Sequence, residues 1–212
     1  MIGQLAVWLQ EQMKYADDVF TARDISNCGP LACICHGDCW SNNFLIHYDG
    51  AGDADDASII DWQMLLPDNP GRDVYEFLTS STTPELRKEC GREFLEHYVD
   101  TFMSVLRQLG VRLEDEGLDR DSVMAEIEKR RMYGLLMGLV LLPSVIDDTM
   151  TSKLDEMSRD LHAVEARGAD PGHTCDVFAE AQNSLTLDGV MANEMLCHRI
   201  IGLVEEFRQV LQ

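Results

Sequence analysis

Positive charge is scarce in this sequence of 212 residues. Lys and Arg number 17 against 38 Asp and Glu, which gives a formal net charge of −21 at pH 7. A surface this acidic repels phosphate backbones and anionic lipid. The composition therefore argues against a nucleic-acid partner, and a phosphate-bearing ligand would need metal ions to neutralise its charge.

The sequence also lacks an export signal and a long hydrophobic run. Residues 1–10 contain no basic n-region and no long apolar stretch. The most apolar segment, residues 132–146, is shorter than the ~20 residues that a bilayer requires, and Pro143 interrupts it. We therefore expect a buried helix there and no membrane span.

Cysteines are too few for a disulfide-stapled miniprotein. The seven present are odd in number and unevenly spaced, which fits reduced thiols and a cytoplasmic location. Hydrophobic residues make up 45% and charged residues 26% of the chain, as in ordinary globular proteins. The length suits one domain with a substantial core.

Periodicity predicts a short β-containing start and a helical remainder, an α+β fold without a doubly wound sheet. The expected early elements are a helix over residues 4–20, a buried strand over 31–35, and a hairpin of strands 44–48 and 58–62 around an acidic loop, 49–57. Thr83 and Pro84 are typical of a helix start, and Gly110 of its end. The other expected segments are a helix over 122–142, a charged segment over 152–167 and a last helix from about 189.

The polar loop at residues 36–43 has the residue types that phosphoryl transfer needs. Asp38 lies five residues before Asn43, and Asp61 ends the partner strand of the predicted hairpin. Antiparallel pairing brings Asn43 and Asp61 to the same end of that hairpin, where their oxygens suit Mg²⁺. In phosphoryl transfer one Asp accepts the proton of the attacking hydroxyl, while an Asn and a second Asp hold the metal. The spacing H-x-D-x₄-N echoes a kinase catalytic loop.

Two motifs carry a family resemblance. Residues 36–43 read H-G-D-C-W-S-N-N and residues 60–63 read I-D-W-Q. They resemble the H-G-D-L-W-x-x-N and I-D-F-Q motifs of the ecdysteroid kinase-like family, also called CHK kinase-like, which is related to choline and aminoglycoside kinases. Cys39 and Trp62 replace apolar residues and spare the polar positions. Arg72-Asp73-Val74 is similar to a later Asp-Leu pair of the family.

The resemblance implies a role for each matching residue. Asp38 would be the catalytic base, and Asn43 and Asp61 the metal ligands. His36 would brace the loop, and Asp73 would hydrogen-bond the loop backbone. The family implies ATP as co-substrate with Mg²⁺, and a small-molecule hydroxyl as acceptor.

The resemblance also implies a domain assignment, the C-terminal lobe of a protein-kinase-like fold over residues 1–212. It comprises the catalytic loop (36–43), the metal-binding Asp segment (60–63) and a helical substrate-side part (73–212). The nucleotide lobe of such kinases, with its phosphate-binding Lys, is expected to be absent, because only ~30 residues precede the loop and Lys14 lies in a helix. We therefore expect a truncated kinase in which no residue is assigned to nucleotide binding.

Three alternatives remain open. The chain could be a non-catalytic small-molecule-binding or regulatory remnant. Met1 could be a wrong start of a kinase about twice as long. More remotely, the chain could be a metal-dependent hydrolase. An exposed lobe interface, formed by residues 31–35 and the helix containing Trp8, could support self-association.

Other polar clusters receive simpler interpretations. Cys28, Cys33, Cys35 and Cys39 lack the paired spacing of structural zinc sites. Asp53, Asp55 and Asp56 are expected at a solvated hairpin tip, because the EF-hand Gly and distal Glu are missing. Residues 129–131, Lys-Arg-Arg, are expected on a solvated helix face.

Overall fold

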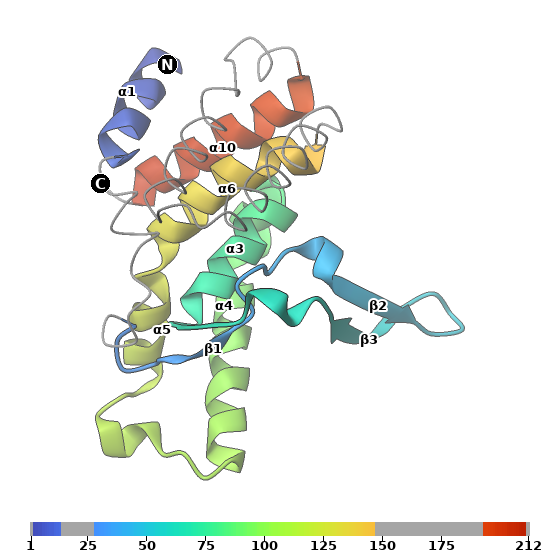
Figure 1. Ribbon diagram of the computed structural model, residues 1–212, viewed down its shortest axis with the longest axis vertical. Helices are drawn as coiled ribbons and strands as arrows, with labels where there is room; N and C mark the ends of the chain where they lie inside the picture. The colour runs from blue at the N-terminus through green and yellow to red at the C-terminus, as the bar shows by residue number, and fades with distance from the viewer. Residues whose placement is uncertain (1, 14–27, 147–192, 211–212) are drawn as a thin grey trace, which may run out of the picture.

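The computed structural model describes residues 2–13, 28–146 and 193–210, and these form mostly helices with two small antiparallel sheets (Figure 1). The helices are α1 (Ile2–Met13), α3 (Gly71–Ser81), α4 (Pro84–Gln108), α5 (Arg120–Glu128), α6 (Arg131–Ile146) and α10 (Glu194–Val210). The strands are β1 (Cys33–Cys35), β2 (Phe44–Tyr48), β3 (Ala54–Ile59) and β4 (Leu66–Asp68). Short 3₁₀ helices are η2 (Ser41–Asn43), η3 (Trp62–Met64) and η4 (Leu113–Glu116). This composition is compatible with the α+β class.

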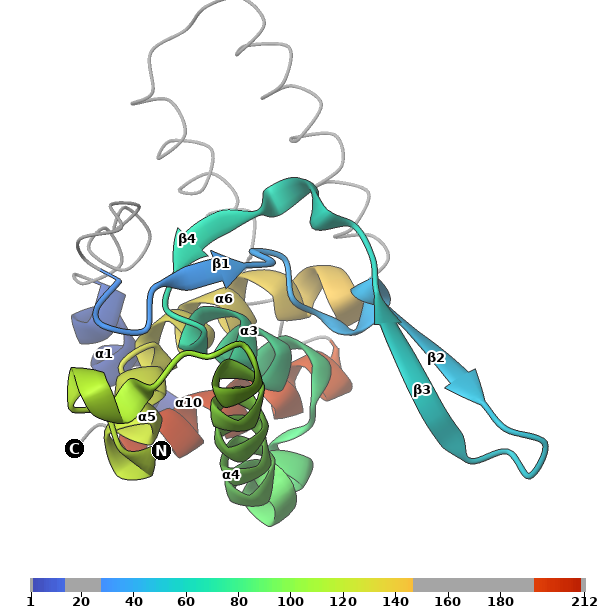
Figure 2. The ribbon, with the colours of Figure 1, turned by 90° about the horizontal axis from the view of Figure 1, so that it is seen from below.

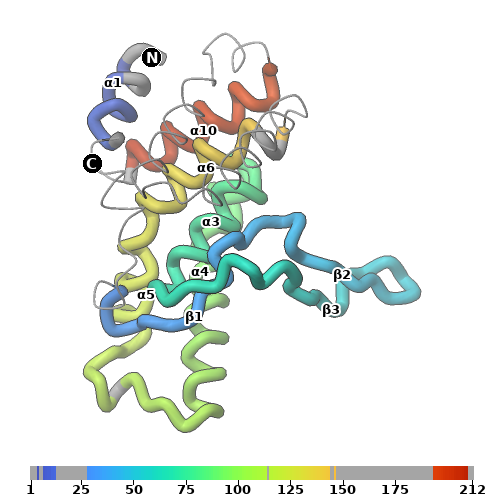
Figure 3. Tube along the Cα trace, in the orientation of Figure 1, coloured from blue at the N-terminus to red at the C-terminus, as the bar shows by residue number. Residues whose placement is uncertain are grey.

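Helix α3 lies at the centre of the helical part and packs against α6, which in turn runs alongside α10 (Figures 1 and 3). Two glycines of α6 allow the close contact with α3. A Cβ at Gly134 would lie 2.6 Å from the Tyr75 Cβ, and one at Gly138 would lie 2.9 Å from the Thr79 Cβ. Spaced by four residues, these glycines share one face of α6. Larger side chains there would force the two helices apart.

The core consists of two clusters of buried apolar side chains. One joins α3, α4 and α5 and includes the fully buried Val99, Val123 and Ile127. The other joins α6 and α10 through residues such as Leu135 and Leu203. Each side chain of this size contributes about 1.5–3 kcal/mol when fully buried.

The predicted start of α4 is confirmed. The Thr83 side chain accepts a hydrogen bond from the Leu86 N–H at 3.3 Å, and Pro84 occupies the first turn. Beyond Gln108, Gly110 adopts a positive φ of 82°, which glycine tolerates without steric cost. The cap and the glycine therefore bound this helix as expected.

The hairpin differs from its prediction in the length of its loop. Strand β3 begins at Ala54, so residues 54–57 extend the strand and the loop between the strands spans only 49–53. In both views the hairpin extends away from the helices (Figures 1 and 2), and β3 is exposed along its length. Because β3 has no buried face, its pairing does not require alternating apolar residues, and the pattern gave no signal for residues 54–57.

The end of β3 also differs from the prediction. The strand stops at Ile59 rather than at residue 62, and Asp61 follows with a left-handed backbone, φ 64°. This turn leads the chain into η3. Asp61 therefore lies just beyond the end of the hairpin ladder rather than in it.

The predicted buried strand over residues 31–35 is only partly correct. Strand β1 covers Cys33–Cys35 and pairs with β4, with Cys33 opposite Asp68. Cys35 is buried, whereas the Ile34 side chain is 68% exposed. A two-stranded sheet covered on one side buries only alternate residues, so the apolar run did not indicate complete burial.

The single helix predicted over residues 122–142 is two helices, α5 and α6, which meet at residues 129 and 130. The Arg130 side chain donates to the Asp68 carboxylate at 2.6 and 3.0 Å, so residues 129–131 do not form a uniformly solvated face. The C-terminal end of α5 lies close to the start of α3, because a Cβ at Gly71 would lie 2.2 Å from the Ile127 carbonyl oxygen. The break between α5 and α6 coincides with these long-range contacts, and no Pro or Gly marks it in the local sequence.

The remaining predictions concern the chain ends. Helix α1 covers Ile2–Met13 of the helix predicted over residues 4–20, and residues 14–20 lie outside the described part of the chain. The charged segment 152–167 and residues 189–192 also lie outside it, whereas the last helix is present as α10.

Helix α6 continues past Pro143 to Ile146. Within the described residues, no helix combines the length and apolarity needed to cross a membrane.

Candidate functional site

The loop at residues 36–43 is anchored at its start by the first turn of α3. The Asp73 carboxylate accepts hydrogen bonds from the backbone N–H groups of His36 at 2.6 Å and Gly37 at 3.0 Å. Gly37 has a φ of +82°, and a Cβ there would lie 2.2 Å from the Met64 carbonyl oxygen. Only glycine fits this close approach, so the backbone of the loop enters the site along a fixed path.

His36 joins the loop to the chain segment that follows the hairpin. The side chain is buried, its Nε2 lies 2.8 Å from the Ile60 carbonyl oxygen, and its ring contacts the Trp62 ring at a centroid distance of 4.8 Å. Both contacts hold the ring in place. The geometry is that of a bracing residue rather than one directed at a substrate.

Asp38 and Asn43 contact each other directly. The Asn43 Nδ2 donates to the Asp38 Oδ2 at 3.0 Å and to the Asp38 carbonyl oxygen at 2.8 Å. Asn43 is buried at the end of η2, which is tied to α3 by the Ser41 N–H donating to the Ser81 Oγ at 2.8 Å. The Phe44 and Phe77 rings pack 5.1 Å apart beside it. The loop therefore lies on one face of α3, and its carboxylate is oriented by the amide.

Asp61 lies at the same end of the hairpin as Asn43. The Ile60 N–H donates to the Asn43 carbonyl oxygen at 3.0 Å, and Asp61 is the next residue. Asp is one of the few residues that adopt the left-handed conformation without a large penalty. The Asp61 residue is exposed, and no hydrogen bond ties its carboxylate to the described part of the chain.

The donor set of Asn43 and Asp61 fits Mg²⁺. Because Asn43 uses its amide nitrogen on Asp38, its Oδ1 is the group available to a cation. One amide oxygen and one carboxylate are hard ligands, and Mg²⁺ takes one or two carboxylates and completes its shell with phosphate and water. Within residues 2–13, 28–146 and 193–210 no three His, Cys, Asp or Glu side chains gather into a group that could hold a metal ion. The described residues therefore do not supply a complete set of protein ligands for a metal ion.

Sequence reasoning missed a buried carboxyl group beside the loop. Glu76, one turn after Asp73, is fully buried, and the Tyr133 hydroxyl donates to its Oε2 at 3.0 Å. The pKa of Glu76 is raised to about 7, chiefly by burial; the Tyr133 hydrogen bond and the charge of Arg72 lower it, and the charges of Asp73 and Asp38 raise it. Apart from its helical spacing from Asp73, nothing in the sequence pattern marks this group.

Burial also raises the pKa of Asp73, although the two backbone N–H groups of the loop lower it.

A second missed feature is Asp68, whose carboxylate pairs with Arg130 and, at 3.3 Å, with Arg72. The Arg72 guanidinium lies 4.2 Å from the centre of the Tyr133 ring. These contacts connect the start of α3 to α6, and they hold the helix that carries Asp73.

Comparison with protein families gives a match that covers the loop. The family model described as the ecdysteroid kinase-like family matches residues 5–111, about half of the chain, and this range contains both motifs. No curated protein and no solved structure matches the chain.

Proposed function

Because the chain belongs to the ecdysteroid kinase-like family, we propose that it is the catalytic half of a kinase-like phosphotransferase. In this proposal the γ-phosphate of ATP is transferred to a hydroxyl group of a small molecule, with Mg²⁺ as the metal. The domain corresponds to the C-terminal lobe of a protein-kinase-like fold. The membership supports the reaction class, and the geometry of the loop supports the residue roles.

The observation that carries the proposal is the pairing of Asp38 with Asn43. The Asn43 amide occupies Oδ2 of Asp38 at 3.0 Å, which leaves Oδ1 without a hydrogen-bond partner among the described residues. A carboxylate held in one orientation with one unoccupied oxygen can accept the proton of an attacking hydroxyl. Asp73 supports this arrangement by fixing the backbone two residues earlier.

The Oδ1 of Asn43 and the carboxylate of Asp61 would hold Mg²⁺. When bound, the metal would neutralise the charge of the phosphates, a requirement made stronger by the net charge of −21. His36 and Asp73 act through the backbone of the loop and do not contact substrate. The chain's own contribution is therefore to orient one base and to place two oxygen ligands at one end of the hairpin.

Titration calorimetry of ATP with and without Mg²⁺ tests the metal site. We expect binding only with Mg²⁺, at least a tenfold loss of affinity in Asp61→Asn, and no change in Asp53→Asn. The control makes the same charge change in the loop of the same hairpin, where Asp53 is exposed. Equal binding by both variants would remove Asp61 from the proposal.

Phosphate transfer tests the base. ADP release in the presence of a mixture of small-molecule alcohols should fall at least 100-fold in Asp38→Asn, while Mg²⁺–ATP binding is retained. Full activity in Asp38→Asn would show that the base is misassigned. Nucleotide binding without transfer to any alcohol would favour the non-catalytic alternative.

A further inference from the structure

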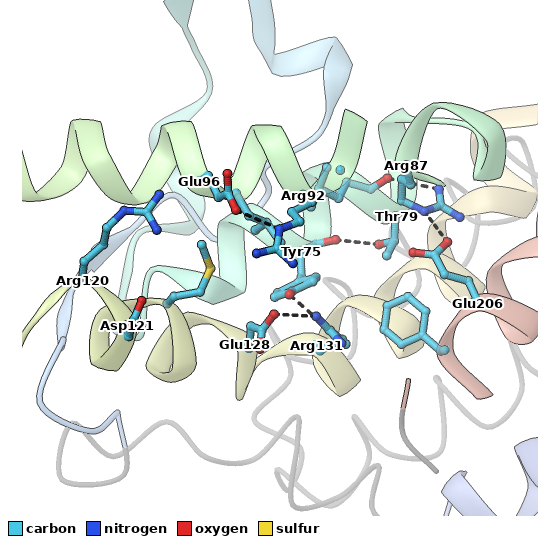
Figure 4. Close-up of a pocket in the computed structure, with 15 residues that line it drawn as sticks. Tyr75, Thr79, Arg87, Arg92, Glu96, Arg120, Asp121, Glu128, Arg131 and Glu206 are labelled. Atoms are coloured by element: carbon cyan, nitrogen blue, oxygen red, sulfur yellow. Dashed lines mark hydrogen bonds and ion pairs between the residues drawn. The ribbon is translucent and has the colours of Figure 1, made fainter. Parts of the chain in front are cut away.

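A cavity of about 380 Å³, lined by residues of α3, α4, α5, α6 and α10, does not call for a charged ligand (Figure 4). Arginines and carboxylates of its lining neutralise one another. The dashed lines in Figure 4 include the ion pairs Arg87–Glu206, Arg92–Glu96 and Arg131–Glu128. The observations that point to a ligand lie instead on β1.

Strand β1 places two thiol groups side by side. Successive residues of a strand point to opposite faces, so Cys33 and Cys35 share one face and Ile34 lies on the other. The two Sγ atoms are 4.0 Å apart. Strand β4 pairs with one edge of β1, and Figure 2 shows the two strands side by side. The strand thus presents a pair of sulfur atoms that one ion could bind together.

The separation of the sulfur atoms fits a bridging metal ion. A thiolate bond to Zn²⁺ is about 2.3 Å long, so two such bonds span 4.0 Å at an angle of about 120° at the metal. A disulfide would need the sulfurs at about 2.05 Å, with Cα atoms about 4.4–6.8 Å apart. Cα atoms two residues apart on an extended strand lie about 6.4–6.8 Å apart, at the upper end of that range. A bridging ion therefore fits β1 as it stands, whereas a disulfide would require the strand to shorten.

The neighbouring carboxylates do not add ligands to this pair. Asp68, opposite Cys33 in the sheet, pairs with Arg130 at 2.6 Å, and Asp73 accepts from the His36 N–H at 2.6 Å. Among the residues that the structure describes, no three His, Cys, Asp or Glu side chains form a metal-binding group. Structural Zn²⁺ takes four ligands, whereas Cu⁺ is a soft ion that prefers thiolates and is stable with two of them. The donor set therefore selects Cu⁺.

The electrostatic surroundings favour a cation between the two thiols. The hydrogen bond between them lowers the pKa of Cys33 and raises that of Cys35, and burial raises both. The charges of Asp73 and Asp68 also raise both pKa values, which means that these carboxylates favour positive charge at the sulfurs. Cys33 is half-buried and Cys35 is buried, so Cys33 is the sulfur that solvent reaches.

We propose that Cys33 and Cys35 form a binding site for Cu⁺. The ion binds both sulfurs in a bent, two-coordinate arrangement and displaces the thiol protons, which pass to the solvent. No electron is transferred, because the metal arrives and stays as Cu⁺. The site is independent of the proposed phosphotransferase function and needs neither ATP nor Mg²⁺.

Anaerobic titration of the full chain with Cu⁺ held by bicinchoninate tests the site, because this coloured complex loses its colour when the protein takes the ion. Loss of an outer-shell partner of a metal site costs about 10–100-fold in affinity, so loss of a ligand in Cys33→Ser should weaken the tightest Cu⁺ site at least about 100-fold. Cys90→Ser serves as control, since Cys90 is also half-buried but lies on α4. It should leave the affinity unchanged. Unchanged affinity in Cys33→Ser, or an equal loss in Cys90→Ser, would overturn the assignment.

Two further measurements test the coordination. X-ray absorption of the Cu⁺-loaded protein should show two sulfur neighbours, and Zn²⁺ should bind at least about 100-fold more weakly than Cu⁺ because two of its four positions would lack protein ligands. Three or more sulfur neighbours, or equal affinity for Zn²⁺, would refute the two-coordinate site. These experiments contain no nucleotide and no Mg²⁺, so their failure is distinguishable from failure of the phosphotransferase proposal.

Discussion

Replacing Glu76 by Gln should remove the contribution of this buried carboxyl group to the dependence of stability on pH between 5 and 8. The pKa of Glu76 is raised from 4.5 to about 7, chiefly by burial. The folded protein therefore binds the proton more tightly than the unfolded chain. This stabilises the fold at low pH, and the contribution is lost as the pH rises through 7. The charged carboxylate thus destabilises the fold at pH 8 and not at pH 5.

The magnitude follows from the same values. One pKa unit corresponds to about 1.4 kcal/mol. Ionisation of Glu76 should therefore lower the free energy of unfolding by about 2.5 kcal/mol between pH 5 and pH 8. The amide that Glu76→Gln introduces cannot ionise, and its oxygen can still accept from the Tyr133 hydroxyl. The difference in stability between Glu76→Gln and the unmodified protein should therefore grow in favour of the variant by that amount over this pH range.

Urea unfolding of both proteins at pH 5, 6, 7 and 8 provides the measurement, since subtracting their free energies of unfolding cancels the contributions of the groups that they share. Glu89→Gln, an exposed change on α4, serves as control and should give a nearly constant difference. Tyr133→Phe should move the transition to higher pH, because it removes the hydroxyl that favours the charged form. A difference for Glu76→Gln that stays constant within about 0.5 kcal/mol would refute the argument that burial dominates this site.

Three further substitutions test the loop and the helix cap. Gly37→Ala should destabilise the protein by at least about 2 kcal/mol in urea unfolding, because it adds left-handed strain and a clash with the Met64 carbonyl; unchanged stability would show that the loop can shift. Asp73→Asn should expose the amide protons of His36 and Gly37 to hydrogen exchange, since one acceptor and the charge are lost; retained protection would contradict the anchoring role. Thr83→Ala should lower stability by about 1 kcal/mol in thermal denaturation without altering ATP binding, and an effect on ATP binding would argue against a purely local cap.

Features specified by neighbouring residues could be predicted from the sequence. Thr83 with Pro84 marks a helix start, because the cap and the proline act within one turn. The hairpin near Asn43 and Asp61 was likewise expected, since a break in the pattern separates two short apolar runs. The family motifs added the expected roles of Asp38 and Asp73, and the structure contains the predicted hydrogen bonds from the loop backbone to Asp73.

Features set by distant parts of the chain could not be predicted. Glu76 is an ordinary polar residue of an amphipathic helix until Tyr133 covers it. Arg130 lies in a basic run that suggests solvent exposure, but its partner Asp68 lies 62 residues away. The boundary between α5 and α6 is similar, because no Gly or Pro marks it.

The way the loop at residues 36–43 is anchored has a consequence for the order of folding. His36 contacts Ile60 and the Asp73 carboxylate, 24 and 37 residues further along the chain. Apart from the short helix η2, the loop has no regular structure to hold it before those partners have been made. Closing such loops costs chain entropy that only the completed contacts repay. During synthesis the residues of the loop would thus be made before these partners, and they would become ordered only after the hairpin had closed and α3 had formed.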